Sequence, residues 1–156
     1  GGQAGRTMEI QRLIGRSLRA ATDLHKLGEL QVKIDCDVLQ ADGGTRTSAI
    51  TGGAVALADA CAWMEREHGT PNPFDRLVAA VSVGVVQGVE VLDLCYAEDK
   101  TADVDANVVQ VEPDRFVEVQ GTGENDTFDR SQSDGLLDLA TGGIAALFAE
   151  QRKVLG

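Results

Sequence analysis

Residues 34–47 read Ile34-Asp35-Cys36-Asp37-Val38-Leu39-Gln40-Ala41-Asp42-Gly43-Gly44-Thr45-Arg46-Thr47. The first half continues an alternation of apolar and polar side chains that begins at Leu30 and ends at Val38. This period predicts a β-strand over residues 30–38 with one buried face. The two glycines then predict a tight turn, and the residues that follow open a helix. Because the first backbone N–H groups of a helix have no partner within it, they favour an anion. The stretch therefore predicts a strand, a turn and a helix, with a candidate phosphate site at the turn.

The residues at this turn allow two interpretations. Arg46 supplies a guanidinium fork that matches two phosphate oxygens, and hydroxyl groups flank it at Thr45 and Thr47. An ordinary connection between a strand and a helix, with Thr45 as the N-cap, explains the same residues equally well. The turn is not a P-loop, because the pattern G-x-x-x-x-G-K-[ST] and its lysine are absent. This absence weakens a kinase or NTPase interpretation.

The composition predicts one globular domain over residues 1–156. The chain is 43% hydrophobic, but only 4% of its residues are aromatic, and 18 are glycine, so we expect a core of Ala, Val, Leu and Ile. Three cysteines lack zinc-site spacing and are expected to be buried, reduced thiols. No leader and no apolar stretch near 18 residues is visible, which predicts a cytoplasmic protein without a membrane span.

The charge is unevenly distributed along the chain. A formal net charge of −11 argues against nucleic-acid binding through the overall field. Residues 1–26 nevertheless carry five basic and two acidic residues, whereas residues 97–140 carry twelve acidic and three basic ones. One end of the chain is therefore suited to phosphate and another to a divalent cation.

A helix is predicted from Met8 to about Leu24, where apolar residues recur at helical spacing. Arg12, Arg16 and Arg19 lie at i, i+4 and i+7, so they form a basic stripe on this helix. A solvated helix face explains the stripe, and so does contact with RNA phosphates or with another subunit. The sequence leaves both interpretations open.

The rest of the chain predicts further helices and hairpins. A helix rich in small residues covers 49–68, and a C-terminal helix carries the apolar positions between 136 and 148. Residues 79–86 and 89–94 predict a hairpin about Gln87-Gly88, and residues 106–111 and 115–120 predict a second one. This order predicts the α/β class (α+β type), with helices packed against a mixed β-sheet.

Two polar segments are further candidates for a site. Glu98, Asp99, Asp103 and Asp105 place four carboxylates within eight residues, which suits Mg²⁺ or Mn²⁺ and equally describes an acidic loop. The Gly-rich segment 120–124 can form a pocket wall or simply a turn. The residues alone do not decide between these alternatives.

Five stretches, taken together and in order, closely resemble the ribonuclease PH family of bacteria. They are Arg6 to Ala20 (RTMEIQRLIGRSLRA), residues 34–47, Glu98-Asp99, Val104-Asp105 and Gln120-Gly121-Thr122-Gly123-Glu124. The resemblance implies a fold like that of ribosomal protein S5 domain 2. It also implies a phosphate-dependent 3′-to-5′ exoribonuclease, a tRNA nucleotidyltransferase that trims tRNA precursors, acts in rRNA processing, and releases nucleoside diphosphates.

The resemblance also implies roles for individual residues. Arg6, Gly44, Thr45 and Arg46 match the residues that bind inorganic phosphate, the co-substrate. Asp99 and Asp105 match the carboxylates of catalysis and of the divalent metal, with Mg²⁺ expected. Asp105 serves either as the acid that protonates the leaving oxygen or as a metal ligand. The implied partners are RNA and further copies of the chain, as a hexamer built from three dimers.

The chain departs from the family at its N-terminus. Members carry an additional N-terminal portion whose strands complete the sheet, whereas this chain begins just ahead of Arg6. We therefore expect a sheet that lacks those strands. The alternatives to an enzyme are an inactive fragment and a non-catalytic RNA-binding or scaffolding subunit of a ring assembly. The combination of Arg46, Asp99 and Asp105 favours the enzyme, and the absent nucleotide loop disfavours a kinase of related fold.

Overall fold

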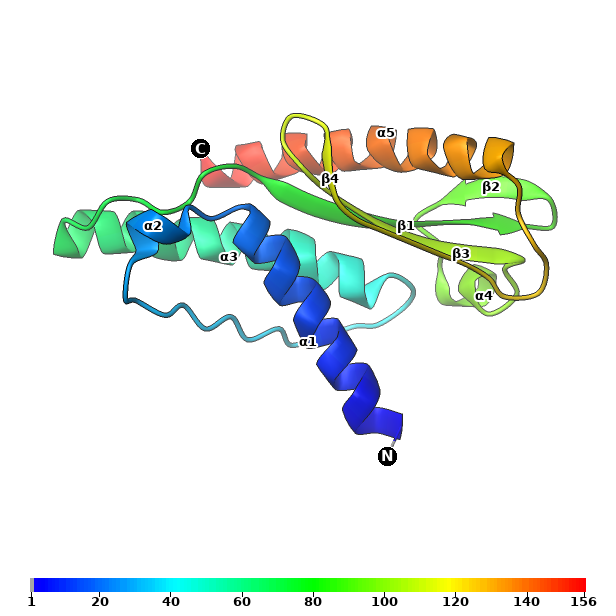
Figure 1. The fold of residues 1–156 in the computed structure, drawn as a ribbon, viewed down its shortest axis with the longest axis horizontal. Coiled ribbons are helices and arrows are strands. Elements are labelled where there is room, and N and C mark those ends of the chain that lie inside the picture. The colour runs from blue at the N-terminus through cyan, green and yellow to red at the C-terminus, as the bar shows by residue number, and fades with distance from the viewer. Residues whose placement is uncertain (1) are drawn as a thin grey trace.

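A computed structural model describes residues 2–156, without the side chains of residues 2–4 and 6. Three helices precede two β-hairpins along the described chain, a short helix separates the hairpins, and a long helix follows them (Figure 1). The elements are α1 (Gly2–Ala20), α2 (Leu24–Leu27), α3 (Thr45–His68), β1 (Val78–Val86), β2 (Val89–Leu92), α4 (Tyr96–Asp99), β3 (Val104–Val111), β4 (Arg115–Gly123) and α5 (Arg130–Leu155).

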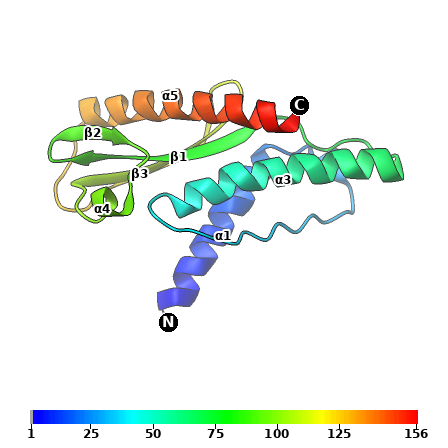
Figure 2. The ribbon, with the colours of Figure 1, turned by 180° about the vertical axis from the view of Figure 1, so that it is seen from behind.

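The strands form one sheet in the order β2-β1-β3-β4. Helix α5 covers one face, and α3 with the end of α1 covers the other (Figures 1 and 2). The predicted α/β class with helices packed on a sheet is confirmed. The expected mixture of strand directions is not found, because each of the three pairings is antiparallel. Residues 30–38, which would have supplied a parallel neighbour through the α3 crossover, join no strand of the described chain.

Strand β1 is buried on both faces, as its continuous apolar run predicts. Val83 and Val85 belong to the core beneath α5, whereas Val78 and Ala80 belong to the core beneath α1 and α3. Four predicted apolar positions of α5 are buried in the first of these cores (Leu136, Ala140, Ile144 and Phe148), and Leu137 and Leu147 pack against it partly buried. The strand thus joins two apolar layers and fixes the position of α3 relative to the sheet.

Both predicted hairpins are confirmed. The β1–β2 turn has positive φ at Gln87 (52°) and Gly88 (77°), the geometry that a two-residue hairpin turn requires. Strands β3 and β4 are joined by residues 112–114, and their register shifts at Val109/Gln110. The second hairpin places the 120–124 segment opposite the start of β3.

A buried amide connects three elements. The Nε2 of Gln151 in α5 donates to the carbonyl oxygens of Thr51 in α3 and Val78 in β1, both at 2.9 Å. The Thr51 hydroxyl oxygen in turn accepts the N–H of Ala80 at 3.1 Å. These bonds satisfy polar groups in the core and hold α3 at a fixed height over the sheet.

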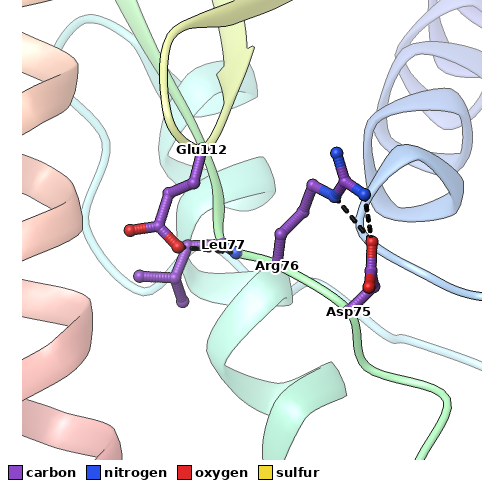
Figure 3. A network of polar contacts seen from close by, with 4 residues as sticks. All are labelled: Asp75, Arg76, Leu77 and Glu112. Carbon is purple, nitrogen blue, oxygen red and sulfur yellow. Dashed lines mark hydrogen bonds and ion pairs between the residues drawn. The ribbon is translucent and has the colours of Figure 1, made fainter.

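At the start of β1, polar contacts anchor the strand to the β3–β4 turn (Figure 3). The Leu77 N–H donates to a Glu112 carboxylate oxygen at 3.4 Å, and the Glu112 N–H donates to the Leu77 carbonyl at 3.1 Å. Arg76 pairs with Asp75, and Arg152 of α5 pairs with Glu112. Exposed ion pairs of this kind contribute roughly 0–1 kcal/mol each to the free energy of unfolding. They therefore make only a small contribution to stability at this end of the sheet.

The strand predicted before the Gly43-Gly44 turn is wrong. Residues 30–38 are extended but form no ladder in the described chain, and α3 lies between them and the sheet (Figure 2). Val32 and Ile34 still pack toward α3, whereas Leu30 and Val38 are each 51% exposed. Alternating hydrophobicity reports a half-buried face, and this face is buried on a helix rather than within a sheet.

Two smaller expectations also need correction. The first helix ends at Ala20, and the separate turn of α2 is capped by Asp23 and ended by Gly28 (φ 61°). The free cysteines differ in burial: Cys61 is buried and Cys36 is exposed.

Within residues 2–156, no helix combines the length and the apolar character needed to cross a bilayer.

Candidate functional site

The candidate site begins at the N-terminus of α3. Gly44 is the N-cap residue, its φ is 62°, and no side chain caps the helix. The Thr47 hydroxyl donates to the Gly44 carbonyl at 2.8 Å and so stabilises the first turn without using its N–H groups. Thr45 is therefore the first helical residue, and its assignment as N-cap is wrong. The uncapped N–H groups remain suited to an anion.

Close backbone packing holds the turn in place. A Cβ on Gly43 would lie 1.8 Å from the carbonyl oxygen of Leu94. The carboxylate of Asp42 accepts the N–H of Tyr96 at 2.8 Å. Because Tyr96 begins α4, the candidate phosphate-binding turn is held against the segment that carries Asp99.

Replacing Gly43 with alanine is expected to disturb this packing. The methyl group has to displace the Leu94 carbonyl, which we expect to cost about 1–3 kcal/mol of stability and to lower the melting temperature by several degrees. Gly52→Ala is the matched control, because its Cβ in α3 would meet nothing within 4 Å. Equal melting temperatures for Gly43→Ala and the unaltered chain would contradict the close packing.

The two predicted carboxylates come from different elements. Asp99 is exposed at the end of α4, and Asp105 is half-buried on β3. Asp105 lies opposite Gly84 of β1 and Thr122 of β4. The candidate site is thus assembled from the start of α3, from α4 and from the part of the sheet where β3 begins.

Electrostatic interactions show that the structure brings the predicted residues together. Burial raises the pKa of the Asp105 carboxyl above its ordinary value, and the negative charge of Asp99 raises it further. The Arg46 guanidinium lowers the same pKa, whereas Glu124 raises it. Arg46 and Asp99 therefore each lie within electrostatic reach of Asp105.

Three residues near the site had no individual role predicted from the sequence, although Glu124 ends the candidate 120–124 segment. Glu124 follows β4 directly, and counting the hairpin register outward from the 112–114 turn brings it near Asp105. Ser82 and Asp93 lie beneath Gly44, with Ser82 Oγ 3.6 Å and Asp93 Oδ1 3.5 Å from the position of a Gly44 Cβ. The signal for Ser82 is a hydroxyl inside an otherwise apolar strand.

The predicted basic residues of α1 differ in their surroundings. Arg16 forms an ion pair with Glu118 of β4. Arg12 and Arg19 are exposed. The side chain of Arg6, the fourth predicted phosphate ligand, lies outside the described residues. The basic stripe is therefore in part a connection between α1 and β4.

Among the described residues, Asp99 and Asp105 offer two carboxylates to a metal ion, but not a complete set of protein ligands. No group of three or more His, Cys, Asp or Glu side chains in residues 2–156 is placed to hold a metal ion, within the side chains described. Asp99 and Asp105 nevertheless repel each other electrostatically, and a cation relieves such repulsion. Mg²⁺ commonly binds one or two carboxylates and takes its other ligands from substrate phosphates and water. The donor set fits Mg²⁺ in that mode.

Comparison with known proteins identifies the family of the chain. Two family models, described as "3′ exoribonuclease family, domain 1" and "domain 2", match residues 1–62 and 76–143. A protein of Corynebacterium diphtheriae named ribonuclease PH is 60% identical over 152 residues, which are 97% of this chain. The chain spans 63% of the length of that relative.

Solved structures share the fold at low sequence identity. An archaeal exosome core matches with a TM-score of 0.73 and 20% sequence identity. The match covers 97% of this chain and 64% of the exosome chain. A second match is an Archaeoglobus fulgidus exosome with RNA bound to the active site, with a TM-score of 0.70 and 20% sequence identity. This match covers 97% of this chain and 62% of the exosome chain. Together with the two family matches, the 60% identity shows that the chain belongs to the 3′ exoribonuclease family.

Proposed function

We propose that this chain removes nucleotides from the 3′ end of RNA by phosphorolysis and releases them as nucleoside diphosphates. The observation that carries the proposal is the position of Arg46, at the uncapped start of α3 and within electrostatic reach of Asp105, which also interacts with Asp99. An anion cradle alone would serve many functions. A cradle beside an acidic pair can present phosphate to a phosphodiester as a nucleophile.

The start of α3 is proposed to bind the attacking phosphate. The first backbone N–H groups of the helix and the Arg46 guanidinium supply hydrogen bonds and positive charge, with Thr45 and Gly44 shaping the turn and Arg6 as a further proposed ligand. Holding phosphate in line with the terminal phosphodiester replaces a bimolecular encounter by an oriented one. Arg46 also stabilises the negative charge that gathers on the phosphoryl oxygens.

Asp105 is proposed to act on the leaving group. A P–O bond forms between the attacking phosphate and the terminal nucleotide, and the bond to the 3′-oxygen of the preceding nucleotide breaks. That oxygen needs a proton, and the half-buried Asp105 carboxyl beside Arg46 is the candidate donor. The alternative role for Asp105, as a metal ligand, predicts the same loss on substitution.

Asp99 and Asp105 are the residues proposed to hold Mg²⁺. When bound, the ion would supply positive charge to the phosphoryl oxygens. The two carboxylates would hold this charge at the site, near the Arg46 guanidinium that acts on Asp105.

The proposal extends to substrate and assembly. We propose tRNA precursors as the substrate, the cytoplasm as the location, and a hexamer of three dimers as the working assembly. The exposed Arg12 and Arg19 are proposed to contact RNA phosphates or a neighbouring subunit. The name of the Corynebacterium relative and the exosome-like fold support these proposals. Mass measurement in solution tests the assembly.

Incubation with a short RNA tests the function. Shortening from the 3′ end is expected only when inorganic phosphate is present, and an RNA blocked by a 3′-phosphate is the control substrate. Binding of RNA without shortening at any phosphate concentration would contradict the proposal and favour a scaffolding subunit.

A further inference from the structure

A side chain next to Asp105 has no role in the function proposed so far. Asn107 lies two residues along β3, so it faces the same side of the sheet as Asp105. This is the side covered by α1 and α3, because Val109 and Val111 farther along β3 belong to the core beneath those helices. Val104, Ala106 and Val108 face the opposite core beneath α5. Asn107 therefore lies between the helix-covered part of this face and Asp105.

The register places Asn107 on the phosphate side of the site. It lies directly opposite Ser82 of β1, and Ser82 lies beneath Gly44 at the start of α3. Gln120 of β4 lies opposite it on the other side. The Asn107 side chain is half-buried and forms no side-chain hydrogen bond within the described part of the chain. Its amide thus offers a free donor and a free acceptor to a substrate.

The chemistry of the leaving group indicates what this amide can bind. The 3′-oxygen that leaves belongs to the penultimate nucleotide, and in RNA the adjacent carbon carries a 2′-hydroxyl, which both donates and accepts. Residues 105 and 107 are separated by about 6.6 Å along a strand, so both can reach neighbouring oxygens of one ribose.

We infer that Asn107 binds the 2′-hydroxyl of the penultimate nucleotide and thereby selects RNA over DNA and positions the leaving 3′-oxygen. The inference rests on the proposed function and adds its specificity-determining residue. Thr122, which lies opposite Asp105 on β4, is the competing hydroxyl-bearing neighbour, but it is one strand farther from Gly44 and exposed.

The test compares two substrates that differ in one atom. Values of kcat/KM are measured for an RNA and for the same RNA with a single 2′-deoxy sugar at the penultimate position. The unaltered chain is expected to prefer the full RNA about ten-fold, the effect of one hydrogen bond. Asn107→Ala is expected to lose about ten-fold on RNA and to leave the rate on the deoxy substrate unchanged, with the KM for phosphate unaltered.

Two further variants make the result specific. Asn107→Ser keeps a polar side chain and is expected to retain part of the preference, and Thr122→Val is expected to retain all of it. A ten-fold preference that survives Asn107→Ala, one that disappears in Thr122→Val, or none in the unaltered chain would overturn the inference while leaving phosphorolysis intact. Absence of phosphate-dependent release from the unaltered chain overturns the proposed function, and the inference falls with it.

Discussion

Asp105→Asn is expected to lower kcat for phosphorolysis by about 10²–10⁴-fold, the usual contribution of a positioned acid or base. Asparagine keeps the shape of the side chain but cannot donate the carboxyl proton or supply a charged oxygen to Mg²⁺. The measurement is the initial rate of nucleoside diphosphate release at saturating RNA and phosphate. Asp114→Asn, in the exposed β3–β4 turn, is the matched control and should retain activity. A rate within two-fold of the unaltered chain would contradict the assignment of Asp105.

The same substitution should not destabilise the fold. Burial and the charge of Asp99 raise the pKa of Asp105 in the folded chain, so its charged form costs stability. That cost is absent below the unfolded pKa, grows as pH rises between the unfolded and the raised, folded pKa, and is complete above the folded pKa. In EDTA, the melting temperature of Asp105→Asn should therefore exceed that of the unaltered chain at neutral pH, with a difference that shrinks in acid. A difference that grows in acid would contradict the raised pKa.

Arg46→Ala is expected to lower kcat/KM for phosphate by about 10²–10³-fold, because it removes the charged donor at the start of α3. It also removes the charge that lowers the pKa of Asp105, so the carboxyl should hold its proton to still higher pH. A phosphate titration of the reaction rate measures the effect. Lysine at this position should restore part of the binding, since it supplies the charge without the planar fork.

The control for Arg46 is an arginine outside the site. Arg130 of α5 pairs with Asp134 on an exposed surface, and Arg130→Ala should leave the phosphate titration unaltered. Identical phosphate titrations for Arg46→Ala and the unaltered chain would show that the anion is not bound at this turn.

Local patterns predicted most of the helices and hairpins. The apolar period of α5 and the Gln87-Gly88 turn depend on neighbours in sequence, and both are found as predicted. The strand predicted over residues 30–38 failed because pairing depends on a partner strand, which hydrophobic alternation does not report. The absence of that pairing is also why the sheet is antiparallel rather than mixed.

The candidate site was predicted in part. The turn proposed to bind an anion and the acidic pair each have a local signal in the sequence. Their proximity, however, depends on the contacts of Gly43 with Leu94 and of Asp42 with Tyr96. Glu124 could be placed near Asp105 only once the β3–β4 register was known. The roles of the residues remain predictions, which the substitutions above test.

The most direct test of phosphate as the nucleophile is to supply ³²P-labelled inorganic phosphate with unlabelled RNA and to identify the product. Attack by phosphate held at the start of α3 predicts nucleoside diphosphate that carries the label in its terminal phosphate. Release of unlabelled nucleoside monophosphate would mean that water is the nucleophile and would contradict the phosphate site at Arg46.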